Sequence, residues 1–440
     1  MSIVVPKGRK YLCADALFRL LHEHFACIAE AGADDGEIPL DDALMSAFAM
    51  FSLKAPSLLS FDKQRAEGNL QTIYGIDRVP CDTRMRERLD PVAPASLRQA
   101  CTLVFRQLQR GKALAPLVFL DGHSLVALDG TEYCSSKTIH CASCLHKEHR
   151  HGAITYFHQR LGAAIIPPDF RDVIPRMPAP IVNQEGPQKN DCERNAAKRF
   201  ISKLRQAHPH LPVIITDEAL SSNAPHIETL HDYGCHYILG VQEGDHTSLF
   251  TQGQAAEEAG RVTYYERHDR AAEVVHAFRF VNDMPRNGSR GDVRVNCIEY
   301  WERGPEQGQH FSGVTDLRVS QRNVYKLMRG GRARWKIENE TFNTRKNQGD
   351  HFEHNDGHGE QNLSVVFARL RLLAFLVDQT PQRCGALFRA VWAKFGSKRL
   401  LWERRRALCY DYRLHAMREL LEALYVGVAK SHPMILPDAS

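Results

Sequence analysis

The sequence predicts an α/β fold with a β-rich insertion, an N-terminal helical domain and C-terminal helices. Apolar residues recur at helical spacing up to about residue 110, and short apolar strands then alternate with helices. Strands that alternate with helices indicate an α/β core. Between residues 242 and 315 this alternation breaks and strands separated by turns follow one another, which indicates an insertion of β structure.

These changes of period divide the chain into five segments. We expect a helical N-terminal domain over residues 1–110, the first part of the core over 111–241 and the β-rich insertion over 242–315. The second part of the core then covers 316–380, and a helical region closes the chain over 381–440. Arginines in the N-terminal domain make it a candidate for binding DNA, although packing against the core explains it equally well.

Each expected element has its own pattern. Helices are expected over residues 12–31, 40–53, 74–89, 96–110, 193–207, 320–345 and 362–378. In the core, 117–120 and 124–128 are expected to pair as a hairpin, followed by strands over 154–158, 161–166, 212–216 and 237–241. The insertion is expected to contain strands over 262–266, 273–282, 293–301 and 310–314.

The composition is that of a soluble globular protein. The chain has 440 residues, of which 43% are hydrophobic and 25% charged. No stretch approaches the roughly 20 uncharged apolar residues of a membrane helix, and the N-terminus does not resemble a signal peptide. We therefore expect a cytoplasmic protein. The net charge of +5 permits binding to a polyanion, and residues 322–346 alone hold eight Lys and Arg residues.

Three acidic residues lie on elements that can converge. Asp129 and Asp217 each follow an expected strand, and Glu338 lies in the helix expected over 332–345. Carboxylates at adjacent strand ends can meet at one point, and a helix packed over the sheet can add a third. Such hard oxygen ligands suit Mg²⁺, and two ions about 3.5–4 Å apart can activate a nucleophile and stabilise a leaving 3′-oxygen. Because a single Asp after a strand is usually a turn or cap residue, the prediction rests on the trio.

The helical segment is the most specific of the three motifs. At helical spacing Arg334, Glu338 and Arg345 share one face, with Lys346 beside it. This arrangement places a carboxylate between basic groups that can hold DNA phosphates, and an ordinary ion pair beside an aromatic core stripe is the alternative. The neighbouring Glu218 is expected to point away from the site, because successive side chains of a strand alternate.

These motifs resemble those of the DDE transposases of bacterial insertion sequences, a group whose ribonuclease-H-like core carries a β-rich insertion. In chain order the matching pieces are Leu128-Asp129-Gly130-Thr131, Ile215-Thr216-Asp217 and Arg334-Trp335-Lys336-Ile337-Glu338-Asn339-Glu340-Thr341-Phe342. The insertion falls between the second and third pieces, and the resemblance covers roughly residues 110–380. The family's third motif has Tyr, Arg, Glu and Lys. Arg334 and Glu338 match it, whereas Gly331 stands at the Tyr position and Arg345 at the Lys position.

The resemblance implies a DNA transposase that cleaves transposon ends and joins them to target DNA by two-metal phosphoryl transfer. Its catalytic residues, which would also hold two Mg²⁺ or Mn²⁺ ions, would be Asp129, Asp217 and Glu338. Its partners would be double-stranded DNA, as transposon ends and target, and further copies of the chain in a homo-oligomer on DNA. No membrane is implied, and the protein would act in the bacterial cytoplasm, at the nucleoid.

The resemblance also implies contacts to DNA. Arg334, Arg345 and Lys346 would contact the phosphate backbone. In related transposases an aromatic residue of the insertion can stack on a flipped base, which makes Trp301 a candidate, although an ordinary sheet-face tryptophan is the commoner case. Two other functions remain open: a ribonuclease-H-like nuclease that cuts DNA without joining it, and a DNA-binding protein without catalytic activity.

A segment rich in cysteine and histidine follows the first motif. Cys141 and Cys144 form a Cys-x-x-Cys pair, and His146 and His149 follow closely. Two thiolates and nearby imidazoles are plausible ligands for tetrahedral Zn²⁺. Such a zinc would be structural, because thiolates are poor ligands for magnesium. A metal-free loop is the alternative.

Overall fold

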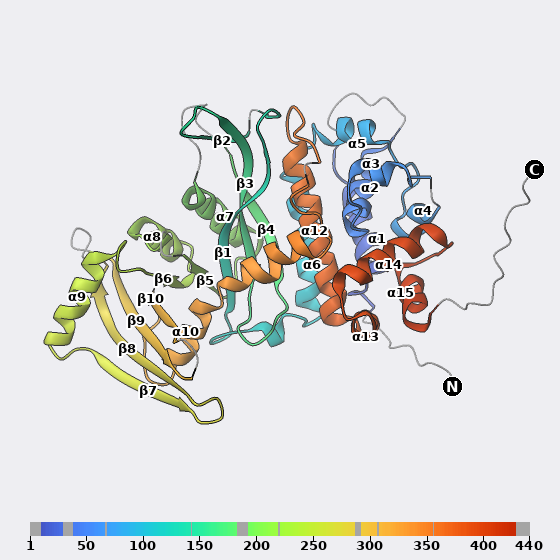
Figure 1. Cartoon of the computed structure of the whole chain (residues 1–440). Helices are drawn as coiled ribbons and strands as arrows, with labels where there is room; N and C mark the ends of the chain where they lie inside the picture. Colours follow the sequence, from blue (N-terminus) through green and yellow to red (C-terminus); the bar gives the residue numbers. More distant parts are fainter. Residues whose placement is uncertain are drawn as a thin grey trace, which may run out of the picture. The chain divides into compact units, whose positions relative to one another are not determined.

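The computed structural model describes residues 10–29, 38–66, 68–141, 143–182, 192–218, 221–286, 292–305, 308–354 and 356–427. The chain forms two compact units, one of residues 1–113 with 347–440 and the other of residues 114–346 (Figure 1). The described part of the first unit is helical, and all the described strands lie in the second. The chain is therefore a mixed α/β protein, as the sequence predicts.

The helical unit combines the two ends of the chain. Its helices are α1 (Ala14–Phe25), α2 (Leu40–Ser52), α3 (Leu58–Asp62), α4 (Asn69–Tyr74), α5 (Asp82–Leu89), α6 (Ser96–Arg110), α12 (Leu363–Cys384), α13 (Ala386–Phe395), α14 (Lys398–Asp411) and α15 (Met417–Val426). Helices α2 and α12 are buried along almost their whole lengths and contact each other. Beside them, the buried Lys54 Nζ lies 2.6 Å from Asp350 and 2.8 Å from Asp378. A buried charge needs such partners, so this cluster ties α2 to the C-terminal helices.

The second unit is built on one ten-stranded sheet. Its strands are β1 (Ser124–Ser136), β2 (Leu145–Glu148), β3 (Ile154–Ile165), β4 (Ile174–Ile181), β5 (Val213–Asp217), β6 (His236–Gly240), β7 (Thr263–Asp269), β8 (Val274–Pro285), β9 (Arg294–Arg303) and β10 (His310–Thr315). Their order is β2-β3-β1-β5-β6-β10-β9-β8-β7, with β4 paired to β3. Strands β4, β3 and β1 are antiparallel, whereas β1, β5 and β6 are parallel.

The first strands differ from the sequence-based expectation. The hairpin expected over 117–120 and 124–128 is wrong: residues 115–117 form a 3₁₀ turn (η1), and only one bridge joins Val118 to Ser124. Strand β1 pairs instead with β3 and β5, which lie far along the chain. The two strands expected over 154–158 and 161–166 are the single strand β3. Strand β4 was not expected, because its three prolines discourage a strand. It pairs only with β3 in the described structure, and an edge strand tolerates proline.

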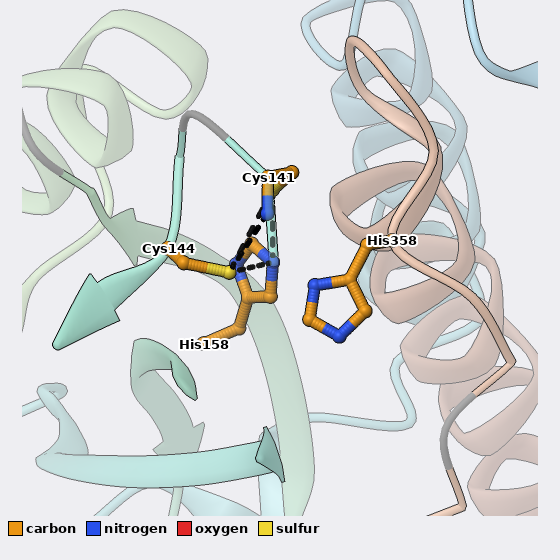
Figure 2. Close-up of side chains that lie close together, drawn as sticks. All are labelled: Cys141, Cys144, His158 and His358. Carbon is orange, nitrogen blue, oxygen red and sulfur yellow. Dashed lines mark hydrogen bonds between the residues drawn. The ribbon is translucent and has the colours of Figure 1, made fainter. Parts of the chain in front are cut away.

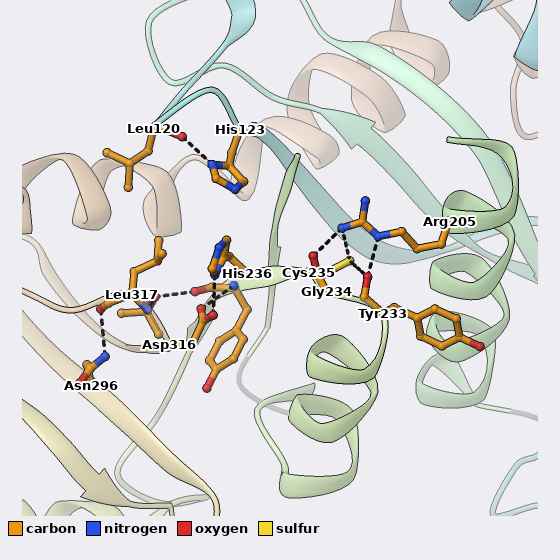
Figure 3. A network of polar contacts seen from close by, with 12 residues as sticks. Leu120, His123, Arg205, Tyr233, Gly234, Cys235, His236, Asn296, Asp316 and Leu317 are labelled. Atoms are coloured by element: carbon orange, nitrogen blue, oxygen red, sulfur yellow. Dashed lines mark hydrogen bonds and ion pairs between the residues drawn. The ribbon is translucent and has the colours of Figure 1, made fainter. Parts of the chain in front are cut away.

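The β-rich insertion extends the same sheet. Strands β7 to β10 lie close to the four expected ranges, and β10 pairs antiparallel with β6. Asp316, just after β10, accepts hydrogen bonds at 3.0 Å from the Tyr237 backbone N–H and at 2.6 Å from the His236 ring (Figure 3). These bonds hold the end of the insertion against the start of β6, so the chain re-enters the core at a defined position.

Helices flank this sheet. They are α7 (Glu193–Ala207), α8 (Ala224–Asp232), α9 (Thr247–Glu258), α10 (Val324–Arg332), the π-helical η3 (Ile337–Asn343) and α11 (Thr344–Asn347). Helix α7 contacts β1, β3 and β4, and Arg205 near its end donates to the carbonyl oxygens of Tyr233 and Gly234, both at 2.6 Å (Figure 3). Asn223 caps α8 by accepting from the His226 N–H. No helix within the described ranges has both the length and the hydropathy to cross a membrane.

The helix expected over 320–345 is interrupted. Helix α10 ends at Arg332, and the chain then forms the π-helical η3, after which Thr344 Oγ1 donates to the Asn339 carbonyl five residues back. Lys336, just before η3, is buried and donates to the carbonyl oxygens of Pro167, Pro168 and Phe170 at 2.7–2.9 Å. Such wide turns occur often at functional sites.

Candidate functional site

Asp129 lies within a strand, not after one. Strand β1 continues seven residues beyond it to Ser136, and Asp129 pairs with Gly162 of β3. On its other side β1 is parallel to β5, with Ala127 beside Thr216. Continuing this register by two residues puts Asp129 level with Glu218. Residues level with each other on parallel strands face the same side, so Asp129 and Glu218 are neighbours and the expectation that Glu218 points away is wrong.

Glu338 joins these two residues from above the sheet. It lies in η3, which contacts β1 and β3. One carboxylate oxygen from each of Asp129, Glu218 and Glu338 lies within 4.8 Å of the others. We call these three residues the carboxylate cluster. Three hard oxygen donors at this separation fit a divalent cation such as Mg²⁺.

A glycine opposite Asp129 makes room for the helix. A Cβ atom added to Gly162 would lie 2.6 Å from the ring of Phe342, which is buried in η3. Because Asp129 and Gly162 are direct cross-strand partners, their side chains belong to the same face of the sheet. The missing side chain at Gly162 therefore lets Phe342 rest on the sheet and brings Glu338 close to Asp129.

Arg334 occupies the centre of the carboxylate cluster. Its Nη2 lies 2.5 Å from Glu338 Oε1 and 2.9 Å from Glu218 Oε1, and its Nη1 lies 3.5 Å from Asp129 Oδ2. The guanidinium thus supplies the positive charge that three convergent carboxylates require. The sequence predicts Arg334 as a phosphate contact, whereas here its partners are the carboxylates.

Asp217 is close to the cluster but faces elsewhere. It is the last residue of β5 and is 6% exposed, with Oδ2 3.9 Å from the buried ring of His226 on α8. Successive side chains of a strand alternate between its two faces, and Asp217 is level with Leu128 and not with Asp129. The side chain of Asp217 therefore faces away from that of Asp129. Of the three residues predicted from the sequence, the structure therefore brings together Asp129 and Glu338. The third residue of the cluster is Glu218 and not Asp217.

Three acidic residues in and beside the cluster, Asp129, Asp217 and Glu193, carry raised pKa values. Burial raises the pKa of Asp129 to about 7, against the lowering effect of Arg334, and Glu338 and Glu218 raise it further. Burial also raises the pKa of Asp217 to about 7, against the hydrogen bond from the Glu218 N–H. Glu193 at the start of α7 has a raised pKa from desolvation and from the charge of Glu218. Sequence reasoning missed Glu193, which no motif marks.

A cavity of about 550 Å³ borders the cluster. It lies where the ends of β6 and β10 meet the segment after α10, and Trp335, 46% exposed, forms part of its wall. The cavity is lined by Asp217, Glu218, Gly240, Val241, Gln242, Asp245, His310, Phe311, Ser312, Gly331, Arg332, Arg334 and Trp335. It is large enough for a ligand of nucleotide size.

The remaining predicted DNA contacts differ in exposure. Arg345 is fully buried, so it presents no surface to a phosphate and the structure does not support the predicted contact. Lys346 is exposed. Trp301 is half-buried on β9, opposite His310 of β10, with 5.4 Å between the ring centroids. His310 lines the cavity, so Trp301 lies one side chain away from it.

The cysteine and histidine segment also forms a group. The Sγ atoms of Cys141 and Cys144 each lie 3.4 Å from Nε2 of His158 on β3 (Figure 2). Among the described residues His146 and His149 are not part of this group, and His149 bonds the Thr155 hydroxyl instead. The expected cysteines are therefore paired with a different histidine. His158 lies 14 residues beyond Cys144, and the antiparallel pairing of β2 with β3, with Leu145 opposite Phe157, brings it close.

Comparisons with known proteins add little. No family model and no curated protein sequence matches the chain. Among solved structures, the crystal structure of the NurA nuclease from Sulfolobus solfataricus is similar over 52% of this chain and 82% of that chain. Its sequence identity is 9% and its TM-score is 0.25, so the likeness bears on neither the fold nor the function.

Proposed function

We propose that the chain is a metal-dependent DNA transposase of the DDE type, with a ribonuclease-H-like core. The observation that carries the proposal is the meeting of Asp129 in β1, Glu218 just after β5 and Glu338 in η3. These residues are far apart in sequence and surround the guanidinium group of Arg334. The strand order β4-β3-β1-β5-β6, with three antiparallel strands followed by two parallel ones, supports a ribonuclease-H-like core.

The carboxylate cluster has the donors that a divalent cation needs. Asp129, Glu218 and Glu338 would hold Mg²⁺ or Mn²⁺, and the charge of Asp129 contributes to the raised pKa of the adjacent Asp217. Bound there, the metal would supply Lewis-acid activation of a water or a 3′-hydroxyl at a phosphodiester. Arg334 neutralises the same carboxylates, so its guanidinium must give up these ion pairs when a metal is bound and is then free to contact a phosphate.

The cavity beside the cluster supports a nucleic-acid substrate. Arg332 and Arg334 line it together with the acidic Asp217, Glu218 and Asp245. His310 and Trp335 offer rings on which a base can stack. DNA held there would place a phosphodiester beside the carboxylates. Lys346 is exposed and can add a phosphate contact.

The proposal is tested by strand transfer in vitro. Purified full-length protein is incubated with Mg²⁺, target DNA and labelled DNA carrying the ends of the encoding element, beside Asp129→Asn and Glu338→Gln. Joined products that vanish in both variants are expected. Cleavage without joining would replace the transposase by a nuclease, and end binding without chemistry in Mg²⁺ or Mn²⁺ would leave a DNA-binding protein.

A further inference from the structure

Cys141, Cys144 and His158 form a compact triangle of ligand atoms in the strand-rich unit. The two Sγ atoms are 3.8 Å apart, and each lies 3.4 Å from Nε2 of His158 (Figure 2). Cys144 is 5% exposed and His158 is 1% exposed, whereas Cys141 is half-buried. Two thiols and an imidazole thus converge in a site largely shielded from water.

The dimensions of this triangle are those of one face of a zinc tetrahedron. Zn–S distances of about 2.3 Å and Zn–N distances of about 2.05 Å, at tetrahedral angles, give edges of ~3.8 Å between two sulfurs and ~3.6 Å between sulfur and nitrogen. The observed edges are 3.8, 3.4 and 3.4 Å. Each agrees with its ideal value to within about 0.2 Å, the tolerance appropriate for a metal site.

The surroundings are those of a metal-binding cysteine pair. The Cys144 N–H donates to the Cys141 carbonyl at 3.1 Å, which closes a tight turn, and the Cys141 N–H donates to Cys144 Sγ at 3.4 Å. Backbone N–H groups directed at sulfur stabilise thiolate ligands. The ring of Tyr133 stacks on His158, with centroids 5.7 Å apart, and holds the imidazole in place.

A disulfide and a magnesium site both fit this triangle less well than zinc does. A disulfide requires sulfurs about 2.05 Å apart, and these two are separated by 3.8 Å. Magnesium prefers oxygen ligands, so two sulfurs and a nitrogen exclude it from this site. The triangle shares no residue with the carboxylate cluster.

We propose that Cys141, Cys144 and His158 bind a structural zinc ion that fastens the Cys141–Cys144 turn to strand β3. A fourth ligand completes the tetrahedron. The zinc would join the turn leading into β2 to the strand that pairs with β1, and so stabilise the part of the sheet that carries Asp129. This proposal is independent of the transposase proposal, because it concerns metal content and not catalysis.

The test measures metal in the full-length protein. Protein purified without chelators is analysed for zinc by mass spectrometry, and the reduced apoprotein is titrated with Co²⁺. We expect one zinc per chain, and for Co²⁺ the visible absorption of a tetrahedral site with a thiolate charge-transfer band, which competing zinc abolishes. X-ray absorption should find two sulfur ligands. A reduced wild-type protein that binds neither metal, or a metal without sulfur ligands, would overturn the proposal.

Variants then identify the ligands. Cys144→Ser and His158→Ala should each lower the affinity for zinc at least about tenfold, because even the loss of a residue that only orients a ligand has an effect of this size. The matched controls are His149→Ala, from the same segment, and Cys235→Ser, a buried cysteine of the same unit outside the triangle. Full zinc content in Cys144→Ser or His158→Ala would contradict the assignment. The wild-type titration decides the question even where a variant fails to fold.

Discussion

Arg334 and Glu338 form an ion pair across one turn, with Nη2 2.5 Å from Oε1, in the middle of a site that suits a metal ion. The same guanidinium group reaches Glu218 and Asp129. The three carboxylates cannot bind a cation while Arg334 keeps its present position between them. Metal loading and the position of Arg334 should therefore be linked.

Replacement of Arg334 tests this competition. In Arg334→Gln the competing charge is lost, so the affinity for Mn²⁺ should rise by about tenfold, the effect of one pKa unit of charge interaction. The proposed phosphate contact is lost as well, so DNA cleavage should fall. Calorimetric titration with Mn²⁺ measures the affinity. Arg332→Gln is the control, because Arg332 pairs with Glu302 and not with the cluster. Equal Mn²⁺ affinity in Arg334→Gln and wild type would rule out competition.

Glu218 and Asp217 are adjacent in sequence and face different sides of the sheet, so single mutations can test their roles in metal binding separately. The geometry predicts that Glu218→Gln weakens Mn²⁺ binding about tenfold or more, whereas Asp217→Asn changes it less. The resemblance to DDE transposases predicts the reverse. Titration of both variants, with strand transfer measured in parallel, decides between the two. Loss of binding in Asp217→Asn alone would restore the sequence-predicted trio.

Gly162 should be intolerant of a side chain. In Gly162→Val the new atoms meet Phe342, so η3 must move and carry Glu338 away from Asp129. We expect a loss of about 1–3 kcal/mol in the free energy of unfolding, typical of overpacking, and a larger loss of DNA cleavage than stability alone explains. Gly244→Val is the control, since a Cβ there meets nothing within 4 Å. Wild-type cleavage by a folded Gly162→Val protein would contradict this role.

Lys336 should act as an anchor for η3. Lys336→Met keeps the apolar stem but removes three hydrogen bonds to the carbonyl oxygens of Pro167, Pro168 and Phe170. Hydrogen bonds to a charged group contribute about 1.5–3 kcal/mol, so a decrease of this order is expected in denaturant unfolding, with weaker Mn²⁺ binding. Lys326→Met, at an exposed position on α10, provides the comparison. If both variants unfold alike, Lys336 has no special role.

The raised pKa of Asp129 makes metal binding depend on pH. Burial raises this pKa to about 7, and the metal needs the ionised form. The Mn²⁺ affinity should therefore rise between pH 6 and pH 8, by up to about tenfold per pH unit below the pKa. Asp129→Asn, which should bind Mn²⁺ weakly at any pH, is the control. A flat wild-type profile would contradict a pKa of about 7 for Asp129 in the metal-free protein.

The metal-free protein should show the opposite trend in stability. Folded-state pKa values of about 7 for Asp129 and Asp217 lie above the unfolded value of about 3.9. Their contribution to stability is fully present below the unfolded pKa and is lost as the pH rises through about 7. Thermal unfolding with chelator should show this loss, which the double variant Asp129→Asn, Asp217→Asn should reduce.

Sequence periodicity determined much of the second unit. The strands of the insertion, helix α7 and strand β5 lie close to their expected positions, because apolar spacing is a local property. Chemistry-bearing residues were also visible: Asp129, Glu338 and the Cys141–Cys144 pair stand out by type and context. The proline-rich strand β4 was not predicted, because its place at the edge of the sheet cannot be read from the local sequence.

Only the tertiary structure decided which of these residues meet. The parallel register of β1 and β5 sets Glu218, and not Asp217, beside Asp129, since a shift of one residue turns a side chain to the other face. The antiparallel pairing of β2 with β3, which sets Leu145 opposite Phe157, brings His158 to the two cysteines in place of His146 and His149. Register and long-range pairing depend on the packing of the whole sheet. The sequence therefore determined the chemical groups, and the fold selected their partners.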